Sequence, residues 1–331
     1  MVMGRRLTCL LLIAVMALSG VRGVRGRTLY GVHGLSDNYY RYSCPNAESV
    51  IQTAVSTELD KNLKLAAGLI RMQFHDCFVE GCDGSVLLDG SNTEKHAPVN
   101  TKLAGYEVID AAKAAVEAVC PGTVSCADII AYAARDSTVK LNGARWEVQG
   151  GRKDGFHSSA PQAEADLPPP EFGASELIDS FARRGLSTTQ MVILSGSHTV
   201  GVADCSKIVG RLYNFNNNQM TDPSMDPAYA EQLKKDCPQN SWNTTIEVFM
   251  DTITPGSFDS NYYQVLKQKQ GLFTSDQTLS NDARTSGTVD SLMENGRFQK
   301  EFGEAMRAMA AVGVKCGSQG EIRKYCRSVN Y

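Results

Sequence analysis

The stretch RMQFHDCFVEGCDGS, Arg71 to Ser85, places an Arg, a His, two Asp and two Cys close together. Arg71 and His75 are four residues apart at the end of a predicted helix over Lys61–Phe74, so their side chains project from one face. Asp76 points about 100° away, because an α-helix has about 3.6 residues per turn. One helix end can therefore present an Arg/His pair to one site and an Asp to another.

The N-terminus predicts a secretory signal peptide. Arg5 and Arg6 precede an apolar run over residues 7–18, and small residues follow at Ser19 and Gly20. This is the order of a signal peptide, and the run is too short to span a bilayer. We therefore expect a cleaved signal over residues 1–23 and one mature domain over residues 24–331.

Secretion changes the interpretation of the ten Cys residues. An oxidising route favours disulfides over thiolate metal sites. Cys9 leaves with the signal, so an odd number remains and one Cys is left over. Spacing alone does not select the partners.

Composition argues against a nucleic-acid or membrane partner. The net charge is −3, which gives no basic footprint for phosphates. No later segment has the pattern of a membrane span. A hydrophobic content of 42% is enough to form the core of one large domain or two lobes.

The apolar periodicity predicts an all-α fold. An apolar stripe at helical spacing, for example, runs through Leu63, Ala66, Ile70 and Phe74. Ser125, Ser187 and Ser260 are candidate N-caps. The predicted helices are Glu48–Leu59, Lys61–Phe74, Tyr106–Val119, Ser125–Leu141, Gly173–Arg184, Thr188–Leu194, Ala228–Asp236, Ser260–Lys269, Thr288–Asn295 and Gln299–Val312.

The loop after His75 has several interpretations. Cys77 and Cys82 enclose four residues and could form a local disulfide. Asp76, Asp83 and Ser85 offer the oxygen ligands that calcium prefers, although a solvated acidic turn explains them equally well on spacing alone. A zinc site would need Cys thiolates, which secretion disfavours.

The Arg71/His75 pair suits the heterolysis of a polar bond. The imidazole can move a proton while the guanidinium stabilises the departing negative charge. A second candidate, His198, lies in LSGSHTVG between small residues that let a bulky group approach. The chain has no Cys-x-x-Cys-His sequence, so any haem would be held by coordination and packing.

Four segments resemble the secretory plant peroxidases, also called class III haem peroxidases. They are RMQFHDCFVEGCDGSVLLD, CPGTVSCADIIAYAARD, GRKDG and LSGSHTVG, in order and with the family's spacing. The resemblance runs from about Leu35 to Asn330. It implies an all-α haem peroxidase fold, with two helical lobes around a b-type haem and disulfides that staple the chain.

The resemblance also implies the roles of the haem-site residues. His198 matches the iron ligand and Asp276 the carboxylate that hydrogen-bonds it. On the opposite side, His75 matches the proton-transfer group and Arg71 the charge stabiliser. Phe74 matches the aromatic wall, and Asn100 matches the amide that accepts from the catalytic His.

Two calcium sites follow from the same resemblance. The distal site, next to His75, would use Asp76, Val79, Gly81, Asp83, Ser85 and Glu94, with Val79 and Gly81 binding through carbonyls and Glu94 through water. The proximal site, next to His198, would use Thr199, Asp251, Thr254, Ser257 and Asp259.

The family pattern resolves the disulfides as Cys44–Cys120, Cys77–Cys82, Cys126–Cys326 and Cys205–Cys237. It gives Cys316 no partner, and we interpret that residue as an unpaired thiol. Two positions depart from better-known members. Met250 stands where an aromatic or Leu is common, and Lys207 where some members have an aromatic at the haem edge. Asn243 lies in a glycosylation sequon.

The implied function is the oxidation of small phenols, one electron at a time, at the expense of hydrogen peroxide. Pro168, in LPPP, matches a residue that lines the reductant site. The expected cofactors are haem b and two calcium ions, and the protein would be a monomer outside the cell or in the cell wall.

Two alternatives remain on the residues alone. A secreted, non-catalytic calcium-binding module would explain the acids and disulfides but not the Arg71/His75 pair. A metal-dependent hydrolase would need a zinc motif such as H-E-x-x-H, which the chain lacks.

Overall fold

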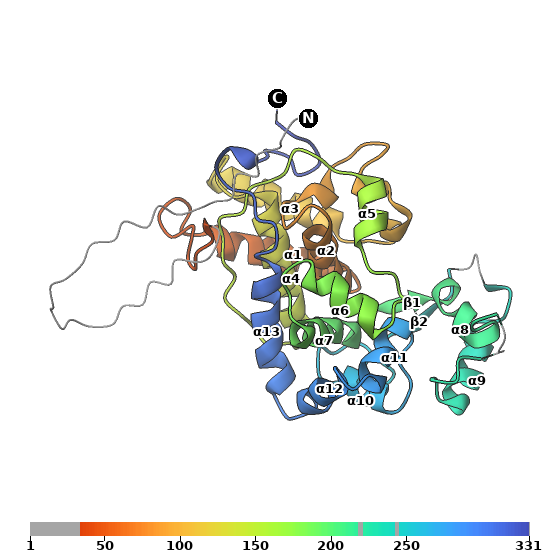
Figure 1. Cartoon of the computed structure of the whole chain (residues 1–331). Helices are drawn as coiled ribbons and strands as arrows, with labels where there is room; N and C mark the ends of the chain where they lie inside the picture. Colours follow the sequence, from red (N-terminus) through yellow and green to blue (C-terminus); the bar gives the residue numbers. More distant parts are fainter. Residues whose placement is uncertain (1–33, 218–220, 242–244, 331) are drawn as a thin grey trace, which may run out of the picture.

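The computed structural model describes residues 34–217, 221–241 and 245–330 (Figure 1). The predicted signal peptide and Asn243 lie outside these ranges. In the described part, no helix is long and apolar enough to cross a membrane.

The described chain is mostly helical, as predicted. Its α-helices are α1 (Ala47–Lys61), α2 (Leu65–Val79), α3 (Tyr106–Val119), α4 (Cys126–Lys140), α5 (Ala160–Asp166), α6 (Ala174–Ala182), α7 (Thr188–Ser195), α8 (Val209–Tyr213), α9 (Pro227–Asp236), α10 (Asn261–Lys267), α11 (Thr274–Asn281), α12 (Ser286–Leu292) and α13 (Arg297–Met309). Short 3-10 turns include η2 (Ser85–Leu87), η3 (Glu94–His96), η4 (Pro98–Asn100), η5 (Gly196–Thr199), η6 (Cys205–Lys207) and η8 (Gly317–Gln319).

Helix α4 is the centre of the first lobe. Nearly all of its residues are buried, and it packs against α1 and α2 while α3 covers α1 (Figure 1). Ser125 caps it as predicted, because its side chain accepts a hydrogen bond from Asp128 N at 3.1 Å. The second lobe gathers α6, α7 and α10 to α12, and α13 packs along α7.

A smaller core lies under α8 and α9. Cys205, Leu212, Tyr229 and Leu233 are among its buried residues, and Met250 is buried there as well. Beside it, β1 (Val202–Asp204) pairs antiparallel with β2 (Glu247–Phe249), with Val202 opposite Phe249. The sequence analysis did not predict this two-stranded sheet.

Several predicted helix boundaries are wrong. Helix α2 runs to Val79 rather than ending at Phe74, so His75 and Asp76 lie inside it. Leu63 precedes the helix and is 48% exposed, so it is not part of a buried stripe. Ser260 stands at the N-cap of α10, but its side chain makes no capping hydrogen bond. Ser187 forms the predicted cap of α7.

The structure contains the four disulfides that the resemblance implies: Cys44–Cys120, Cys77–Cys82, Cys126–Cys326 and Cys205–Cys237. The interpretation of Cys316 as an unpaired thiol is wrong, because Cys316 is disulfide-bonded and no cysteine in the described ranges is free.

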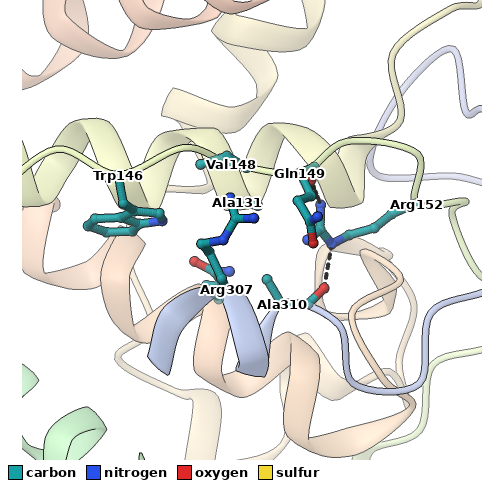
Figure 2. A pocket seen from close by; sticks show the side chains of 8 residues that line it. Ala131, Trp146, Val148, Gln149, Arg152, Arg307 and Ala310 are labelled. Atoms are coloured by element: carbon teal, nitrogen blue, oxygen red, sulfur yellow. Dashed lines mark hydrogen bonds between the residues drawn. The ribbon is translucent and has the colours of Figure 1, made fainter. Parts of the chain in front are cut away.

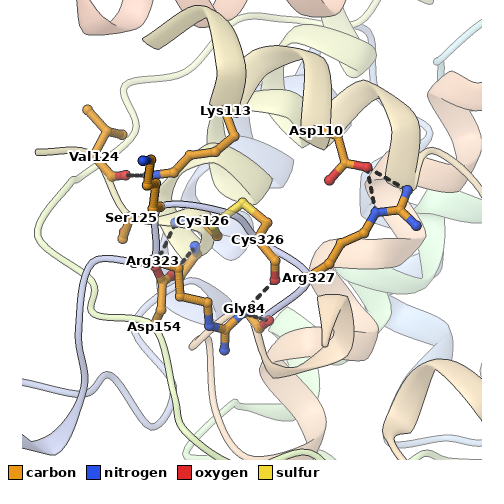
Figure 3. The surroundings of a disulfide bond; sticks show 12 residues. Gly84, Asp110, Lys113, Val124, Ser125, Cys126, Asp154, Arg323, Cys326 and Arg327 are labelled. Carbon is orange, nitrogen blue, oxygen red and sulfur yellow. Dashed lines mark hydrogen bonds and ion pairs between the residues drawn. A yellow bond between two sulfur atoms is a disulfide. The ribbon is translucent and has the colours of Figure 1, made fainter. Parts of the chain in front are cut away.

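The Cys126–Cys326 disulfide joins the start of α4 to the C-terminal segment (Figure 3). Buried Asp154 lies beside it and accepts hydrogen bonds from the backbone N–H groups of Cys126, Ala127 and Arg323, at 3.1, 2.9 and 2.9 Å. Its carboxylate therefore satisfies N–H groups at the first turn of α4 and ties the C-terminal segment to that turn.

Candidate functional site

Helix α2 places Arg71 and His75 one turn apart. Nε of Arg71 donates to Nε2 of His75 at 3.0 Å, and Nη2 of Arg71 donates to the carbonyl of Val99 at 2.9 Å. His75 is buried, whereas Arg71 is exposed. The guanidinium is thus held beside the imidazole while it stays open to an entering molecule.

The other ring nitrogen of His75 is held by an amide. Nδ1 lies within hydrogen-bond distance of Oδ1 of Asn100, and Nδ2 of Asn100 donates to the carbonyl of Glu94 at 2.8 Å. The second bond orients the amide with its oxygen towards the ring. Nδ1 must then carry the proton, because an amide oxygen only accepts, and Nε2 keeps its lone pair.

Burial dominates the protonation of His75. The pKa of His75 is lowered to about 3; burial is the largest cause, the positive charge of Arg71 adds to it, and the hydrogen bond to Asn100 opposes it. The imidazole is therefore neutral at physiological pH. Phe74 lies beside it, with ring centroids 5.7 Å apart, and is backed by Phe78 at 4.1 Å.

His198 lies on η5, directly after α7. Its Nδ1 is 2.7 Å from Oδ1 of Asp276 on α11, and its side chain is 40% exposed. The rings of Tyr262 and Phe273 stand edge-on to it at 6.1 and 5.8 Å. In the described ranges no other hydrogen bond is recorded for this imidazole, so Nε2 is available to a ligand.

Asp276 is held as a carboxylate. Besides His198, it accepts from the hydroxyl of Tyr262 at 2.9 Å and from the backbone N–H of Phe273 at 3.0 Å. Burial alone would raise its pKa, but His198 and these hydrogen bonds lower the pKa below its ordinary value. A charged partner on Nδ1 increases the electron donation of an imidazole ligand to a metal.

The two histidine elements approach each other at Ala67 and Gly201. Gly201 has a φ of +95°, and a Cβ built there would lie 3.4 Å from Cβ of Ala67. Ala67, Arg71 and His75 are spaced by four residues, so they share a face of α2. That face therefore meets the loop that follows His198.

These residues fit a haem. The donor set is an imidazole whose Nδ1 is held by a carboxylate, as in haem and metal sites generally, and the rings of Tyr262 and Phe273 lie beside it. Small residues, Gly196 and Gly201, flank His198.

A second cluster lies at the far end of α2. Asp76, Asp83 and Glu94 are at most 1% exposed. Oδ1 of Asp76, the hydroxyl of Ser85 and Oε2 of Glu94 are buried without a hydrogen-bond partner. Unpaired buried oxygens of this kind are costly unless a cation binds them.

The electrostatics of this cluster suit the binding of a cation. The pKa of Glu94 is raised to about 9, chiefly by burial and next by the charge of Asp76. Burial and the neighbouring Asp83 also raise the pKa of Asp76 well above its ordinary value. No set of three or more His, Cys, Asp or Glu side chains in the described ranges could hold a metal alone. Calcium would therefore have to draw on carbonyls and hydroxyls as well.

Gly155, from the GRKDG stretch, makes room for this cluster. A Cβ built on Gly155 would lie 2.1 Å from Oδ2 of Asp83, and the N–H of Gly155 donates to the carbonyl of Asp83 at 2.8 Å. The backbone at Gly155 thus forms the floor under the carboxylate.

The residues of the expected proximal calcium site are also brought together. Thr199 donates to Oδ2 of Asp251 at 2.9 Å, and Thr254 donates to Oδ2 of Asp259 at 2.8 Å. The hydroxyl of Thr199 lies 3.5 Å from the carbonyl of Ser257. Asp251 and Thr199 are fully buried.

The sequence analysis missed three contacts. Tyr262 donates to Asp276, Lys315 approaches Asp83, and Lys102 bridges to Asp204 on β1. The contacts of Lys315 and Lys102 join segments far apart in the chain, so no local pattern reveals them. Tyr262 lies closer to Asp276 in the sequence, but it stands in an ordinary helical stretch that gives no sign of the contact. Lys207 lies exposed on η6, and Pro168 is partly exposed between α5 and α6.

A small cavity, whose lining includes neither His75 nor His198, lies beside Trp146 and Arg152 (Figure 2). Its volume is about 10 Å³, which is about the space of one water molecule. Gln73, Arg152 and Arg307 are among its lining residues, and Arg152 Nε donates to the carbonyl of Ala310 at 2.8 Å. It is too small for a substrate.

Comparisons with known proteins agree with this geometry. A family model described as peroxidase matches residues 50–295. "Peroxidase 5" of Vitis vinifera is 47% identical over 301 residues, 89% of this chain and 92% of that protein. "Peroxidase 3" of Arabidopsis thaliana is 44% identical over 89% and 92% of the two chains. "Basic peroxidase" of Zinnia elegans is 45% identical over 88% and 89%.

These matches cover the segments that carry both histidines, and they disfavour a non-catalytic calcium-binding module. The mostly helical, disulfide-stapled architecture is that of a haem peroxidase. The chain belongs to the peroxidase family, enzymes that use hydrogen peroxide and haem to oxidise a reductant.

Proposed function

We propose that this protein is a secreted peroxidase that holds haem b through His198 and oxidises small phenols. The observation that carries the proposal is the arrangement of two imidazoles. In each, Nδ1 is engaged by a partner, Asn100 or Asp276, which leaves Nε2 for chemistry. The contact between Ala67 and Gly201 supports placing both on one site.

Haem, when bound, supplies the iron that exchanges electrons with peroxide and reductant. The chain's contribution on the proximal side is the position and basicity of one ligand. Nε2 of His198 would bind the iron. Asp276, through Nδ1, fixes the ring orientation and increases electron donation from the imidazole.

On the distal side the chain moves a proton. Nε2 of His75 takes a proton from one oxygen of hydrogen peroxide and returns it to the other, so that water leaves. Arg71 stabilises the negative charge that develops on the leaving oxygen. Because Arg71 Nε occupies Nε2 at 3.0 Å, an entering peroxide has to displace that hydrogen bond. Phe74 forms the apolar wall beside the reacting atoms.

We assign the reductant site to the approach near Pro168. Its partly exposed position, with a carbonyl able to accept from a phenol, supports this assignment. Lys207, exposed on η6, stands where some members of the family have an aromatic at the haem edge, and its charge would favour reductants with an acidic group.

Two calcium sites complete the proposal. The distal ion would bind Asp76, Val79, Gly81, Asp83 and Ser85, with Glu94 through water. The orphaned oxygens of Asp76, Ser85 and Glu94 support it. The proximal ion would bind Thr199, Asp251, Thr254, Ser257 and Asp259, which already contact one another.

The cellular setting belongs to the same proposal. Residues 1–23 would direct secretion to the exterior or cell wall, Asn243 would carry a glycan, and residues 24–331 would act as a monomer without nucleic-acid or membrane partners. The disulfides support an oxidising compartment.

The test is the visible spectrum of the calcium-loaded, haem-reconstituted protein before and after one equivalent of hydrogen peroxide. Wild type should show a Soret band that shifts rapidly, and His75→Ala a band that shifts at least about 100-fold more slowly. His157→Ala, an exposed histidine without a recorded hydrogen bond, is the matched control and should behave as wild type. Folded protein that binds no haem would refute the proposal.

A further inference from the structure

The side chain of Lys315 lies at the rim of the expected distal calcium site. Its ammonium nitrogen is 3.6 Å from Oδ2 of Asp83 and donates to the carbonyl of Glu80 at 2.9 Å. Asp83 is 1% exposed, and its other oxygen accepts from the N–H of Ser85 at 3.0 Å. A buried carboxylate of the candidate site is thus already paired with a cation of the same chain.

Backbone contacts fix Lys315 in this place. The N–H of Cys82 donates to the carbonyl of Val312 at 2.9 Å. Gly81 and Gly313 touch through their backbones, since a Cβ built on Gly81 would lie 2.6 Å from Cα of Gly313. These contacts hold the segment after α13 against the loop, and this backbone arrangement places Lys315 next to Asp83.

Lys315 differs from the other nearby cation. Arg323 is fully buried, and its guanidinium donates to the carbonyls of Gly84, Gly155 and Cys326. Its hydrogen bonds go to backbone, so it is part of the frame. Lys315 has a side chain that is 25% exposed, and it contacts a carboxylate of the site directly. It can be drawn toward Asp83 or released toward water.

We propose that Lys315 is a tethered cation that competes with calcium for the charge of Asp83 and so sets the affinity of the distal site. This inference rests on the proposed distal calcium site. Without the ion, the ammonium neutralises part of the buried acidic cluster and keeps the loop closed. With the ion bound, the two positive charges share one carboxylate, and their repulsion weakens binding.

The test uses the mature, disulfide-bonded protein and calcium alone. Calorimetric titration gives the number of ions bound and their affinities, and release into excess chelator gives the rates. Asp83→Asn identifies which of the two phases belongs to the distal loop. The variants are Lys315→Met, which removes the charge, Lys315→Arg, which keeps it, and Lys235→Met, an exposed lysine on α9 without an ion pair, as control.

Lys315→Met should bind distal calcium roughly tenfold more tightly and release it more slowly, a size discounted for the partial exposure of the lysine. Lys315→Arg should stay near wild type, and Lys235→Met should equal it. If wild type binds two ions and Lys315→Met leaves the distal affinity unchanged, the role of Lys315 is refuted while the calcium site stands. If Asp83→Asn binds as many calcium ions as wild type, both the distal calcium site and the role of Lys315 are refuted.

Discussion

Nδ1 of His198 donates to Oδ1 of Asp276 over 2.7 Å, and the same oxygen accepts from the hydroxyl of Tyr262 at 2.9 Å. The carboxylate is 2% exposed, so water does not screen its charge from the imidazole. The basicity of the expected iron ligand is therefore set inside the protein, by a residue 78 positions away.

Replacing Asp276 by Asn should weaken this control. An amide carries no charge, so the imidazole donates less electron density, and the ferric state loses stability relative to the ferrous state. We expect a higher ferric–ferrous reduction potential and about 10- to 100-fold lower haem affinity or activity, measured by spectroelectrochemistry and haem titration. Tyr262→Phe removes only one hydrogen bond from Asp276 and leaves the carboxylate more basic. It should therefore shift the reduction potential in the opposite direction, to a lower value. An unchanged potential in Asp276→Asn would contradict this account.

The depressed pKa of His75 predicts a broad pH range for the reaction with peroxide. Because the pKa is about 3, the imidazole stays neutral and able to accept a proton at all higher pH values. The second-order rate constant should be level from about pH 5 to 8 and fall about tenfold per unit below the pKa. Stopped-flow measurements at constant ionic strength test this. An inflection of the rate near the ordinary pKa of histidine would mean that burial does not control the pKa of His75.

Asn100→Leu tests the amide separately. The variant loses the acceptor for Nδ1–H, so neither the tautomer nor the ring orientation of His75 is fixed. The rate constant with peroxide should fall about 100-fold while the affinity for haem, which we expect His198 to set, stays near wild type. A loss of haem affinity equal to the loss of rate would indicate a general disturbance of the fold instead.

Gly155→Ala should damage the distal calcium site without a change of charge. The added methyl group would stand 2.1 Å from Oδ2 of Asp83, so the carboxylate has to move. We expect loss of one bound calcium, or at least about tenfold weaker binding, in calorimetric titration. Gly287→Ala, where a Cβ meets nothing within 4 Å, is the control and should bind both ions.

Asp154→Ala should destabilise the whole domain. Three backbone N–H groups, those of Cys126, Ala127 and Arg323, lose a buried acceptor at once. We expect a loss of about 3 kcal/mol or more in the free energy of unfolding, measured by denaturant titration with disulfides intact. The surface substitution Asp60→Ala, which removes a carboxylate bridged to Lys140, should change little. Equal effects of the two substitutions would contradict the role of Asp154.

The sequence alone places Arg71 and His75 next to each other, because this contact is local. Arg71 and His75 need only a helix between them, and the four-residue spacing suffices to place them together. The end of that helix is less predictable. The apolar spacing continues from Phe74 to the buried Phe78, and α2 runs on to Val79, with Asp76 and Cys77 of the Cys77–Cys82 disulfide in its last turn.

The proximal half depends on contacts that periodicity does not encode. Helix α11, TSDQTLSN, is short and polar, so no apolar pattern announces it, although it carries Asp276. Only the family resemblance connected Asp276 with His198. The contact of Lys315 with Asp83 joins segments more than 200 positions apart, and neither residue carries a local signal for it.

The Cys126–Cys326 disulfide closes a covalent ring that contains α4 to α13, His198 and Asp276. A single protease cut at any surface loop within that ring opens it without releasing a fragment. The nicked chain still runs as one piece until the disulfide is reduced. An enzyme with this connection can therefore be cleaved once within the ring and keep the segments that carry His75 and His198 attached to each other.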